Sequence, residues 1–594
     1  MFLRSHRRVK DGKEHRYYSI EESRRLQSGR VVQRRVLYLG EINDTQQASW
    51  RKTLEVFDEQ RHSYTTRSLF PEDRPIPAEA VDSLRVKLSE MKLRRARPYG
   101  NCWVACELWR QLELNRFWEQ KLERGREEVS WAQVLELLVV NRLIEPGSEF
   151  RLHRQWFDES AMDVLLGVDF AVAEKDRLYR CLDRILPYKR DLFLHLQQRW
   201  KNLFDASFDV LLYDLTSTYV EGEAERNPKA KRGYSRDGRP DCKQVIVALV
   251  ITPEGFPLAY EVMDGNTSDK TTLRGFLVKI EELYGQARRV WLMDRGVPTE
   301  AVLQEMRATE RQFYLVGTPK ARVTKYEKQW LELPWKKVRD SVEVKLFSQD
   351  GELYVLAKSE GRQQKEIAIR RKKLARLLRR LRRMRKSLPK RDQLLLRIGA
   401  AKKEAGRAFG FVKMRVPRKD EEVTAKTFTF HTDKAKLREA QLRDGHYLLR
   451  TNLVAEDPAV LWDRYMQLTQ IEAAFKCLKT ELGIRPIHHQ LEHRVEAHIL
   501  VAFLAYCLSV TLRYRLHAHA PGLTPRAVLE KLASIQMLDV CFPTTDGRCL
   551  TMPRYTEPAE DVALLLHQLK LALPRQPPPR LAALAEQPQV PVKM

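Results

Sequence analysis

The sequence predicts a multidomain α/β protein. Its 594 residues exceed what one hydrophobic core usually holds. Strand-forming runs occupy the middle of the chain, namely FDVLLYDLTSTYV at 208–220 and KQVIVALVITPEGFPLAYEVM at 243–263. Apolar residues recur at helical spacing before these runs, at about 80–205, and again from 456 onward. Buried strands between helical regions favour a sheet that helices cover.

Changes in composition and periodicity divide the chain into six segments. In order, they are a small β segment, a helical region, a strand-rich region, a hairpin with a long basic helix, a second helical region, and a final helix with a Pro-rich tail. Their expected bounds are 1–60, 61–205, 206–320, 321–455, 456–540 and 541–594.

The charge balance points to nucleic acid as the partner. Lys and Arg total 106 against 79 acidic residues, which gives a formal net charge of +27. No uninterrupted apolar run approaches the roughly 20 residues of a membrane span, and the first residues lack the apolar stretch of a secretory signal. The eight cysteines form no CxxC pair. We therefore expect a cytoplasmic protein with reduced cysteines and no membrane association.

The most basic segment, IRRKKLARLLRRLRRMRK at 369–386, is predicted to form a helix. Apolar residues follow a 3-4-3-4 spacing along it, at Leu374, Leu377, Leu381, Met384 and Leu388. This seam indicates a partner helix, and the segment after Pro389 is the candidate for a helical hairpin. The other faces are either solvated or contact DNA. The second interpretation assigns DNA contacts to four residues, Arg379, Arg380, Arg382 and Arg383.

Two aspartates follow apolar strand residues. Asp214 lies within LLYDLTSTYV, and Asp294 ends VWLMD. Acids at the carboxyl ends of central strands are typical of α/β active sites, although each could instead cap a turn. With Glu472 on a later helix, they suggest three converging carboxylates. Such oxygen ligands suit Mg²⁺, and two ions about 3.5–4 Å apart can promote in-line phosphoryl displacement.

The stretch YMQLTQIEAAFKCLKTEL at 465–482 is predicted to form one amphipathic helix. Tyr465, Glu472 and Lys479 fall seven residues apart, so they would project along one margin of its apolar face. A solvated helix edge is the simpler interpretation. The alternative is a functional edge, with Glu472 as a metal ligand and its two neighbours bound to phosphates.

These motifs, in this order, resemble those of DDE-type insertion-sequence transposases. YDLTSTYVEG at 213–222 and the block at 231–269 resemble the family's first-acid block and the block that follows it. VWLMDRGV at 290–297 resembles the second-acid block. Tyr465, Glu472 and Lys479 match in register the Tyr-Arg-Glu-Lys signature of one branch. Its arginine position holds Leu468, a departure that puts one phosphate contact in doubt.

The resemblance implies an RNase H-like mixed sheet interrupted, between the second acid and the glutamate, by a β-rich insertion enlarged by the helical hairpin. It implies two Mg²⁺ ions, with Mn²⁺ as an alternative, held by Asp214, Asp294 and Glu472. The implied activity is hydrolysis at terminal inverted repeats, followed by joining of the 3′-hydroxyl ends to target DNA. A homodimer on the paired ends and a nucleoid-associated bacterial location are expected. Arg236 and Lys243, between core strands, are further candidates for phosphate contact.

Two other functions remain open from the sequence. One is a catalytically silent DNA-binding protein derived from a transposase, which the intact acids disfavour. The other is a host RNase H-like nuclease, which the large insertion and the Tyr-Glu-Lys register disfavour. Recognition of the transposon end is expected in 61–205, because the basic stretches MKLRRARPYG and NRLIEPGSEFRLHRQW lie there in a region predicted as helical.

Overall fold

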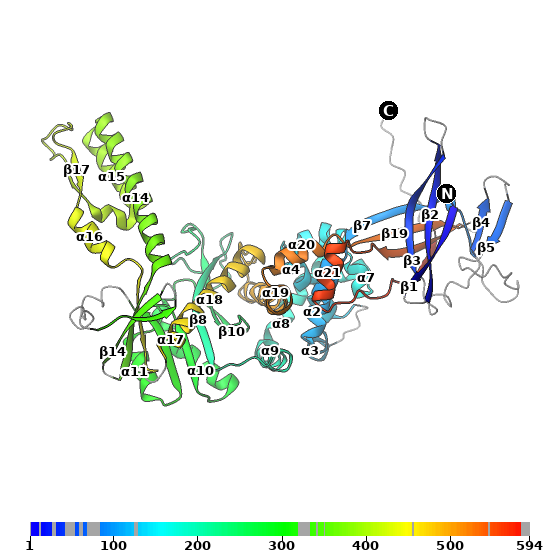
Figure 1. Ribbon diagram of the computed structural model, residues 1–594, viewed down its shortest axis with the longest axis horizontal. Helices are drawn as coiled ribbons and strands as arrows, with labels where there is room; N and C mark the ends of the chain where they lie inside the picture. Colours follow the sequence, from blue (N-terminus) through cyan, green and yellow to red (C-terminus); the bar gives the residue numbers. More distant parts are fainter. Residues whose placement is uncertain are drawn as a thin grey trace. The chain divides into compact units, whose positions relative to one another are not determined.

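The computed structural model divides the chain into two compact units, which are described separately (Figure 1). One unit comprises Met1–Arg184 and Val501–Met594, and the other comprises Ile185–Leu500. Side chains are described only within the backbone ranges given next, from residue 86 onward and without those of 339 and 581–583. The backbone is described for residues 2–10, 13–25, 31–41, 54–58, 63–67, 84–123, 129–318, 333–339, 342–349, 351–453, 457–544 and 547–583.

The unit Ile185–Leu500 is built on a sheet whose first five strands have the RNase H-like order. That order is β10-β9-β8-β11-β12, with β9 antiparallel to both neighbours and β11 parallel to both of its own. Every residue of β9 is buried, as its continuous apolar run predicts. The predicted mixed α/β core is confirmed. Its strands are β8 (Val210–Tyr219), β9 (Gln244–Ile251), β10 (Pro257–Asp264), β11 (Arg289–Met293) and β12 (Gln312–Thr318).

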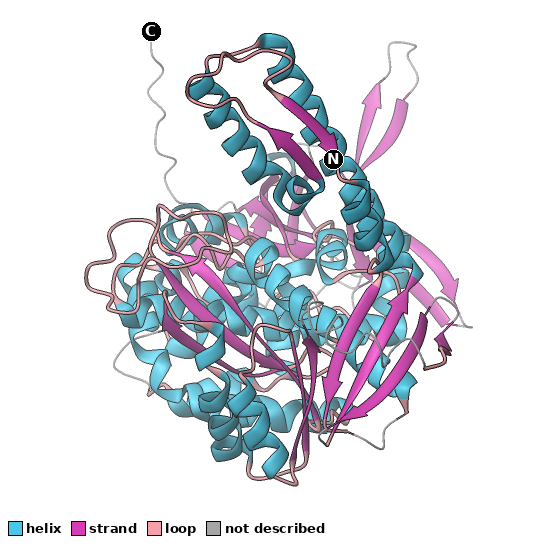
Figure 2. Ribbon diagram, turned by 90° about the vertical axis from the view of Figure 1, so that its left-hand side faces the viewer, coloured by secondary structure: helices cyan, strands magenta, loops and turns pink. Residues whose placement is uncertain are grey.

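Four strands from the segment after β12 extend this same sheet to nine strands (Figure 2). β18 (His446–Thr451) pairs antiparallel with β12, and β15 (Glu352–Ser359) pairs with β18. β14 (Val342–Gln349) and β13 (Lys336–Arg339) complete the edge. The β part of the inserted segment is therefore continuous with the core sheet.

A buried ionic group joins the inserted strands to the core. Glu352 on β15 is 2% exposed and accepts from Arg450 of β18 at 2.6 Å and from Arg307 at 2.7 Å. Arg307 belongs to α11 (Glu300–Ala308), which packs on β12. A buried carboxylate needs such partners, because an unpaired buried charge is strongly destabilising. The pairing thus fixes β15 and β18 against the core.

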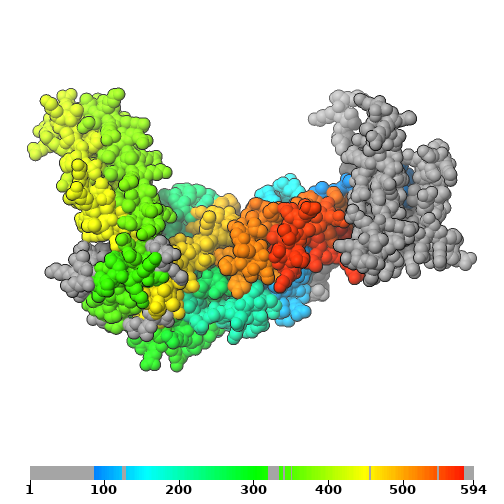
Figure 3. All heavy atoms as spheres, viewed as in Figure 1, coloured from blue at the N-terminus to red at the C-terminus, as the bar shows by residue number. Residues whose placement is uncertain are grey.

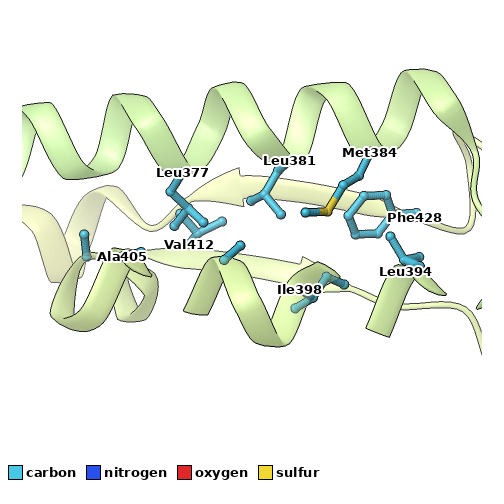
Figure 4. Close-up of a cluster of buried hydrophobic side chains, with 10 residues drawn as sticks. Leu377, Leu381, Met384, Leu394, Ile398, Ala405, Val412 and Phe428 are labelled. Carbon is cyan, nitrogen blue, oxygen red and sulfur yellow. The ribbon is translucent and has the colours of Figure 1, made fainter. Parts of the chain in front are cut away.

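The basic segment forms the predicted helical hairpin, which projects from the sheet of its unit (Figure 3). The hairpin comprises α14 (Glu360–Ser387) and α15 (Arg391–Ala405). Leu377, Leu381 and Met384 of α14 pack into a core with residues that include Leu394, Ile398 and Phe428 (Figure 4). Leu388, the last expected seam residue, is instead 45% exposed, because the helix ends there with a left-handed backbone at φ 40°.

The remaining elements of this hairpin region follow α15. They are η6 (Gly406–Phe411), β16 (Val412–Arg415), β17 (Thr429–Thr432) and α16 (Lys434–Leu442). β16 and β17 form a separate antiparallel pair, which lies alongside the two long helices (Figure 2). Phe428, just before β17, is fully buried against α14 and α15, so the pair completes the core of the hairpin.

In the other unit, one sheet combines a strand from its first segment, Met1–Arg184, with strands from its second segment, Val501–Met594. β7 (Lys92–Pro98) pairs antiparallel with β19 (Gln536–Pro543), followed by β20 (Arg548–Tyr555) and β21 (Arg580–Ala583). Its helices include α2 (Gly100–Gln111), α3 (Leu114–Lys121), α4 (Trp131–Ile144), α8 (Lys175–Ile185), α20 (Pro525–Leu532) and α21 (Glu560–Gln568).

The basic stretch MKLRRARPYG is strand β7, so the interpretation of this stretch as part of a helical region is wrong. Its Arg97 is 1% exposed and pairs with Asp539 at 3.2 Å and Asp163 at 3.3 Å. In the second basic stretch, Arg142 is also buried. Burial therefore withdraws both arginines from any DNA surface, and the ion pair of Arg97 with Asp539 joins β7 to β19.

The first strands of the chain form two small sheets. β1 (Phe2–Lys10), β2 (Lys13–Arg25) and β3 (Val31–Glu41) make an antiparallel meander. The second sheet contains β4 (Leu54–Asp58), β5 (Ser63–Arg67) and β6 (Leu84–Val86). At the other end, 584–594 of the expected Pro-rich tail lies outside the described residues.

One described helix, α19 (Glu492–His519), is long and apolar enough to cross a membrane. Its most apolar window has a mean hydropathy of 1.9, and 94% of that window is buried inside the structure. The core helix of a soluble protein passes the same test, so α19 does not indicate a membrane protein.

Candidate active site

Asp214 and Asp294 lie on neighbouring strands of the core sheet. Tyr213 of β8 pairs in parallel register with Met293, the last residue of β11, so the two aspartates follow at the next position. Asp214 is inside β8, opposite Leu249, and the strand continues to Tyr219. It therefore does not cap a turn. Asp294 does begin one, since its carboxylate accepts the backbone N–H of Arg295 at 2.7 Å.

The environment of Asp214 disfavours its negative charge. Burial, with smaller contributions from the nearby carboxylates of Asp294 and Asp269, raises the pKa of this carboxyl to about 7, against the opposing effects of the Leu215 backbone N–H and Arg236. A half-buried carboxyl beside a second carboxylate is an arrangement that a bound cation stabilises. Among the expected site residues, these two aspartates are the pair that the sheet itself brings together.

Glu472 lies on α18 (Leu468–Lys476), which packs against β8. Alternate residues of a strand share a face, so Asp214 points to the same side as Thr218. Thr218 donates to the carbonyl of Ile484 at 3.4 Å, which places the chain after α18 over that face. The carboxylate of Glu472 is exposed. No choice of oxygens brings all three acids within 4.8 Å of one another, so the carboxylates do not form a closed cluster.

The expectation of one continuous helix over 465–482 is wrong. Tyr465 belongs to α17 (Pro458–Met466), Glu472 to α18, and Lys479 to a π-helical turn at Cys477–Glu481. Hydroxyls compete for backbone carbonyls near both breaks, because Thr469 donates to Met466 and Thr480 donates to Lys476. The three residues therefore do not share a single seven-residue register, and π-turns of this kind are frequent at functional sites.

Tyr465 is enclosed beside the second aspartate. Its ring lies 5.7 Å from that of Tyr447 and 6.1 Å from that of Trp462. Burial raises the pKa of the Tyr465 hydroxyl well above its usual range, and the charge of Asp294 raises it further. The tyrosine is thus an uncharged hydroxyl close to Asp294.

Lys479 forms an ion pair with Asp237, an acidic residue that no sequence motif indicates. Its Nζ donates to Asp237 Oδ1 at 2.8 Å, and Arg485 also pairs with that oxygen. The Asp237 side chain is only 3% exposed. Burial lowers the pKa of Lys479 despite this pairing. In the sequence, Asp237 lies in SRDG, which has the composition of a surface turn, so no pattern distinguishes it from a solvated residue.

The two other core candidates also have internal partners. Arg236 binds both carboxylate oxygens of Asp269, at 2.6 and 2.7 Å, and its backbone N–H donates to Ser217. Lys243 donates to the carbonyl of Glu223 at 2.5 Å. Arg236 lies close enough to Asp214 to oppose the rise in that group's pKa. Arg236 thus lies near Asp214, whereas Lys243 is hydrogen-bonded to the loop that contains Glu223.

The basic helix presents three of its four candidate arginines to solvent. Arg379, Arg382 and Arg383 are exposed along α14. Arg380 is only half exposed, and both it and Arg376 pair with Glu404 of α15. Arg380 therefore already has an acidic partner, because the hairpin brings Glu404 across from it.

Comparison with known proteins shows which family the sequence matches. Residues 206–508, just over half of the chain, match the family model described as "Transposase DDE domain". None of the curated proteins matches the chain. Among solved structures, a chain of the "Mos1 transposase paired-end complex with left transposon end" shows 15% sequence identity. That alignment covers 36% of this chain and 66% of the other, just under two thirds, with a TM-score of 0.13.

The family match spans β8 with Asp214, the turn after β11 with Asp294, the inserted strands and hairpin, and α18 with Glu472. It also covers the complete RNase H-like strand order, which the hydrogen-bonded pairs establish independently. This chain therefore belongs to the transposase DDE domain family.

Proposed function

We propose that the protein binds the terminal inverted repeats of a mobile element, hydrolyses DNA at each end, and joins the resulting 3′-hydroxyls to target DNA. The observation that supports this most directly is the position of Asp214 and Asp294, each one residue after the register pair Tyr213–Met293 of adjacent strands, with α18 packed on β8. In this proposal, 206–320 and 456–540 form the two halves of the catalytic core, and 321–455 is its insertion.

The ligand set fits a pair of hard divalent cations. Asp214, Asp294 and Glu472 offer carboxylate oxygens, which Mg²⁺ and Mn²⁺ prefer. Members of this family generally use divalent metal ions. Two ions held there would activate a water or a 3′-hydroxyl and stabilise the leaving oxygen. A two-ion site does not require all three carboxylates to meet at one point, so the open arrangement of Glu472 is compatible with it.

We further assign the chain to the Tyr-Arg-Glu-Lys branch of these enzymes. Tyr465 beside Asp294 and Lys479 beside the Arg236–Asp237 turn support this, because both flank the proposed metal ligands. Leu468 at the arginine position is the departure. Arg485, which shares Asp237 with Lys479, supplies a guanidinium in the same neighbourhood. In this proposal, Tyr465 and Lys479 hold phosphates on either side of the scissile bond.

Replacing Lys479 by Ala should weaken binding of terminal-repeat DNA and lower the slope of log binding constant against log salt by about one unit. Cleavage at saturating DNA should fall less, because the lysine holds a phosphate and is not a metal ligand. Binding is measured by fluorescence anisotropy over a salt series. The double variant Lys479→Ala/Asp237→Ala is the control, since it also removes the buried acid. Binding restored to the wild-type level in that variant would show that the lysine only neutralises Asp237.

The hairpin is proposed to contact DNA without reading its sequence. Changing Arg379, Arg382 and Arg383 together to Gln should weaken binding to all DNA sequences alike. It should also reduce the salt slope by up to about three units, one for each lost phosphate contact. Arg380→Gln is the matched control and should change the slope less, because Glu404 already pairs with Arg380. An unchanged salt slope in the triple variant would show that these arginines do not contact DNA. The helix would then serve only in packing or face solvent.

Recognition of the transposon end is proposed for 61–205, of which 61–184 belongs to the first unit. We also expect a homodimer to hold the paired ends in the bacterial nucleoid. The footprint should be measured with the full chain. β7 takes its neighbour from β19, so a fragment ending near 205 would leave a sheet of this unit incomplete.

One experiment separates this function from its alternatives. The full chain is incubated with Mg²⁺ and a duplex that carries the element's terminal repeat, and the products are resolved at nucleotide resolution. Cleavage at the element boundary followed by joining supports the transposase. Repeat-specific binding without cleavage would indicate a silent DNA-binding descendant. Cleavage that ignores the repeat would indicate a general nuclease.

A further inference from the structure

The second long helix of the hairpin, α15, has a face that points away from the hairpin core. Its buried residues Leu394, Ile398, Ala401 and Ala405 pack in that core with α14 (Figure 4). Four other residues of α15 each lie two positions before one of these, which is about 200° around a helix and so on the opposite side. With two flanking residues they form the outer face, which consists of Asp392, Leu395, Leu396, Gly399, Ala400 and Lys403.

The outer face is exposed although its centre is apolar. Leu396 is 76% exposed and Leu395 is 39% exposed. Both line an open hollow on the surface of α15, together with Asp392, Gly399 and Ala400. Apolar side chains that are grouped on one exposed face, with charged residues at its ends, are typical of a contact surface.

Gly399, at the centre of the outer face, is not required by the fold of its own unit. It lies inside a helix, where glycine is less stable than alanine. Among the described residues, a Cβ at this position would meet no atom within 4 Å, and the backbone of Gly399 is not left-handed. Glycine does, however, let a second backbone approach closely, which is its use at many contacts between helices.

The order of residues along the outer face makes it complementary to itself in the antiparallel direction. Reversal of the helix about the point between Arg397 and Ile398 exchanges the residues of the face in pairs. The pairs are Asp392 with Lys403, Leu395 with Ala400, and Leu396 with Gly399. Opposite charges meet in the first pair, and a large side chain meets a small one in the other two. A two-fold axis forms each pair twice, whereas a parallel arrangement would bring like charges together.

The basic character of the hairpin does not oppose such a contact. Because α14 packs on the inner side of α15, the α14 helices of two paired copies would lie on the two outer sides of the pair. The arginines proposed to contact DNA would therefore remain accessible. The Asp392 side chain is 95% exposed, and its ion pair with Arg391 is long, at 3.9 Å, so its carboxylate can accept a second cation.

We propose that a second copy of this chain docks on the outer face, with the two α15 helices antiparallel. The contact deepens the homodimer of the proposed function, and its use in holding paired DNA ends rests on that function. The face extends for about 17 Å along one helix, which is small beside a standard interface of about 800 Å² per partner. The dimer should therefore dissociate on dilution.

The first test is sedimentation velocity of the full chain over a concentration series, without DNA or Mg²⁺. The wild type should shift from monomer to dimer as its concentration rises. Gly399→Leu should weaken this association at least about tenfold, because the added side chain holds the two backbones apart. Gly361→Leu is the matched control and should associate like the wild type, since Gly361 is also an exposed glycine in a helix with open space around its Cβ.

Thermal unfolding at low concentration shows that the loss of the dimer is not a loss of folding. Both leucine variants should melt no lower than the wild type, because leucine is a better helix former than glycine and neither position is crowded.

The second test reverses the charges at the ends of the face. Asp392→Lys and Lys403→Glu should each associate more weakly than the wild type, because every antiparallel pair of identical copies then brings like charges together twice. An equimolar mixture of the two variants should recover the dimer, since the mixed pair has opposite charges at both ends.

Three results would overturn the interface: a chain that stays monomeric at all concentrations, a dimer that Gly399→Leu leaves intact, or a mixture that associates no better than either charge variant alone. The second would place the dimer contact on another surface. None of these measurements requires DNA or cleavage, so failure of the interface is distinct from failure of the transposase assignment. That assignment depends on products formed from the terminal-repeat duplex with Mg²⁺.

Discussion

Replacing Glu472 by Gln should abolish cleavage and strand transfer, with losses of several orders of magnitude, while binding to transposon ends stays normal. Gln preserves the size of the side chain and removes its charge. The carboxylate is exposed, and the residues that pack α18 are Ile471, Ala474 and Phe475. The substitution therefore leaves the helix in place and removes one of three anions that would offset two divalent cations.

The measurement is single-turnover cleavage of an end-labelled terminal-repeat duplex with saturating protein and Mg²⁺. Anisotropy on the same duplex without metal verifies binding. Glu481→Gln is a matched control, because Glu481 ends the π-turn after α18 and is not one of the proposed ligands. Normal cleavage by the Glu472→Gln protein would show that Glu472 is not a metal ligand. The residue would then be part of a solvated helix edge.

The sequence was sufficient to predict the central strands and the acids on them. Continuous apolar runs such as that of β9 identify strands covered on both faces, and an acid that follows such a run is conspicuous. The hairpin was also predictable, since Leu377, Leu381 and Met384 recur at the spacing of a helix seam. These features depend on local periodicity, which a single sequence carries.

Features that depend on distant partners were not predictable. The side chain of Arg97 meets that of Asp539 across 442 positions, and nothing in MKLRRARPYG indicates that this basic stretch is a strand with one arginine buried. Asp237 looked like part of a solvated turn, although Lys479 and Arg485 bury it. Basic residues were interpreted as DNA contacts because the acids that pair with them lie far away in the sequence.

The break in the 465–482 helix was missed for a different, local reason. Its apolar spacing fits a regular helix, so periodicity alone gives one element. The structure ends α17 at Met466 and widens the turn at Cys477–Glu481, where a threonine hydroxyl binds a helix carbonyl at each break. A hydroxyl that competes for a helix carbonyl leaves no mark on the apolar spacing, so periodicity does not report it.

Asp214→Asn should make the metal-free protein more stable at pH 8 and eliminate cleavage. In the folded chain, burial raises the pKa of Asp214 to about 7, compared with about 3.9 for an unfolded aspartate. Above pH 7, the folded state must carry a half-buried charge that the unfolded state carries in water. Asn removes this cost, which is on the order of 2–4 kcal/mol.

The difference in stability between Asp214→Asn and the wild type should depend on pH. Between about pH 4 and 7, the folded protein retains a proton on Asp214 that the unfolded chain has released. This group therefore lowers stability progressively as pH rises through that range. The advantage of Asp214→Asn over the wild type should be full above pH 7, shrink as the pH is lowered, and vanish below about pH 4. Thermal unfolding in EDTA across this range measures it, with Asp420→Asn, at an exposed loop position, as the control.

Mg²⁺ should reverse the order of stability. A divalent ion binds the ionised carboxylate, so Mg²⁺ should raise the melting temperature of the wild type, and more at pH 8 than at pH 6, where most Asp214 carries a proton. The Asp214→Asn protein should show little Mg²⁺ effect at either pH. A variant that is less stable than the wild type at pH 8 in EDTA, or equally stabilised by Mg²⁺, would contradict this account. Asp214 would then have a structural role in β8, and the cation would have to be held elsewhere.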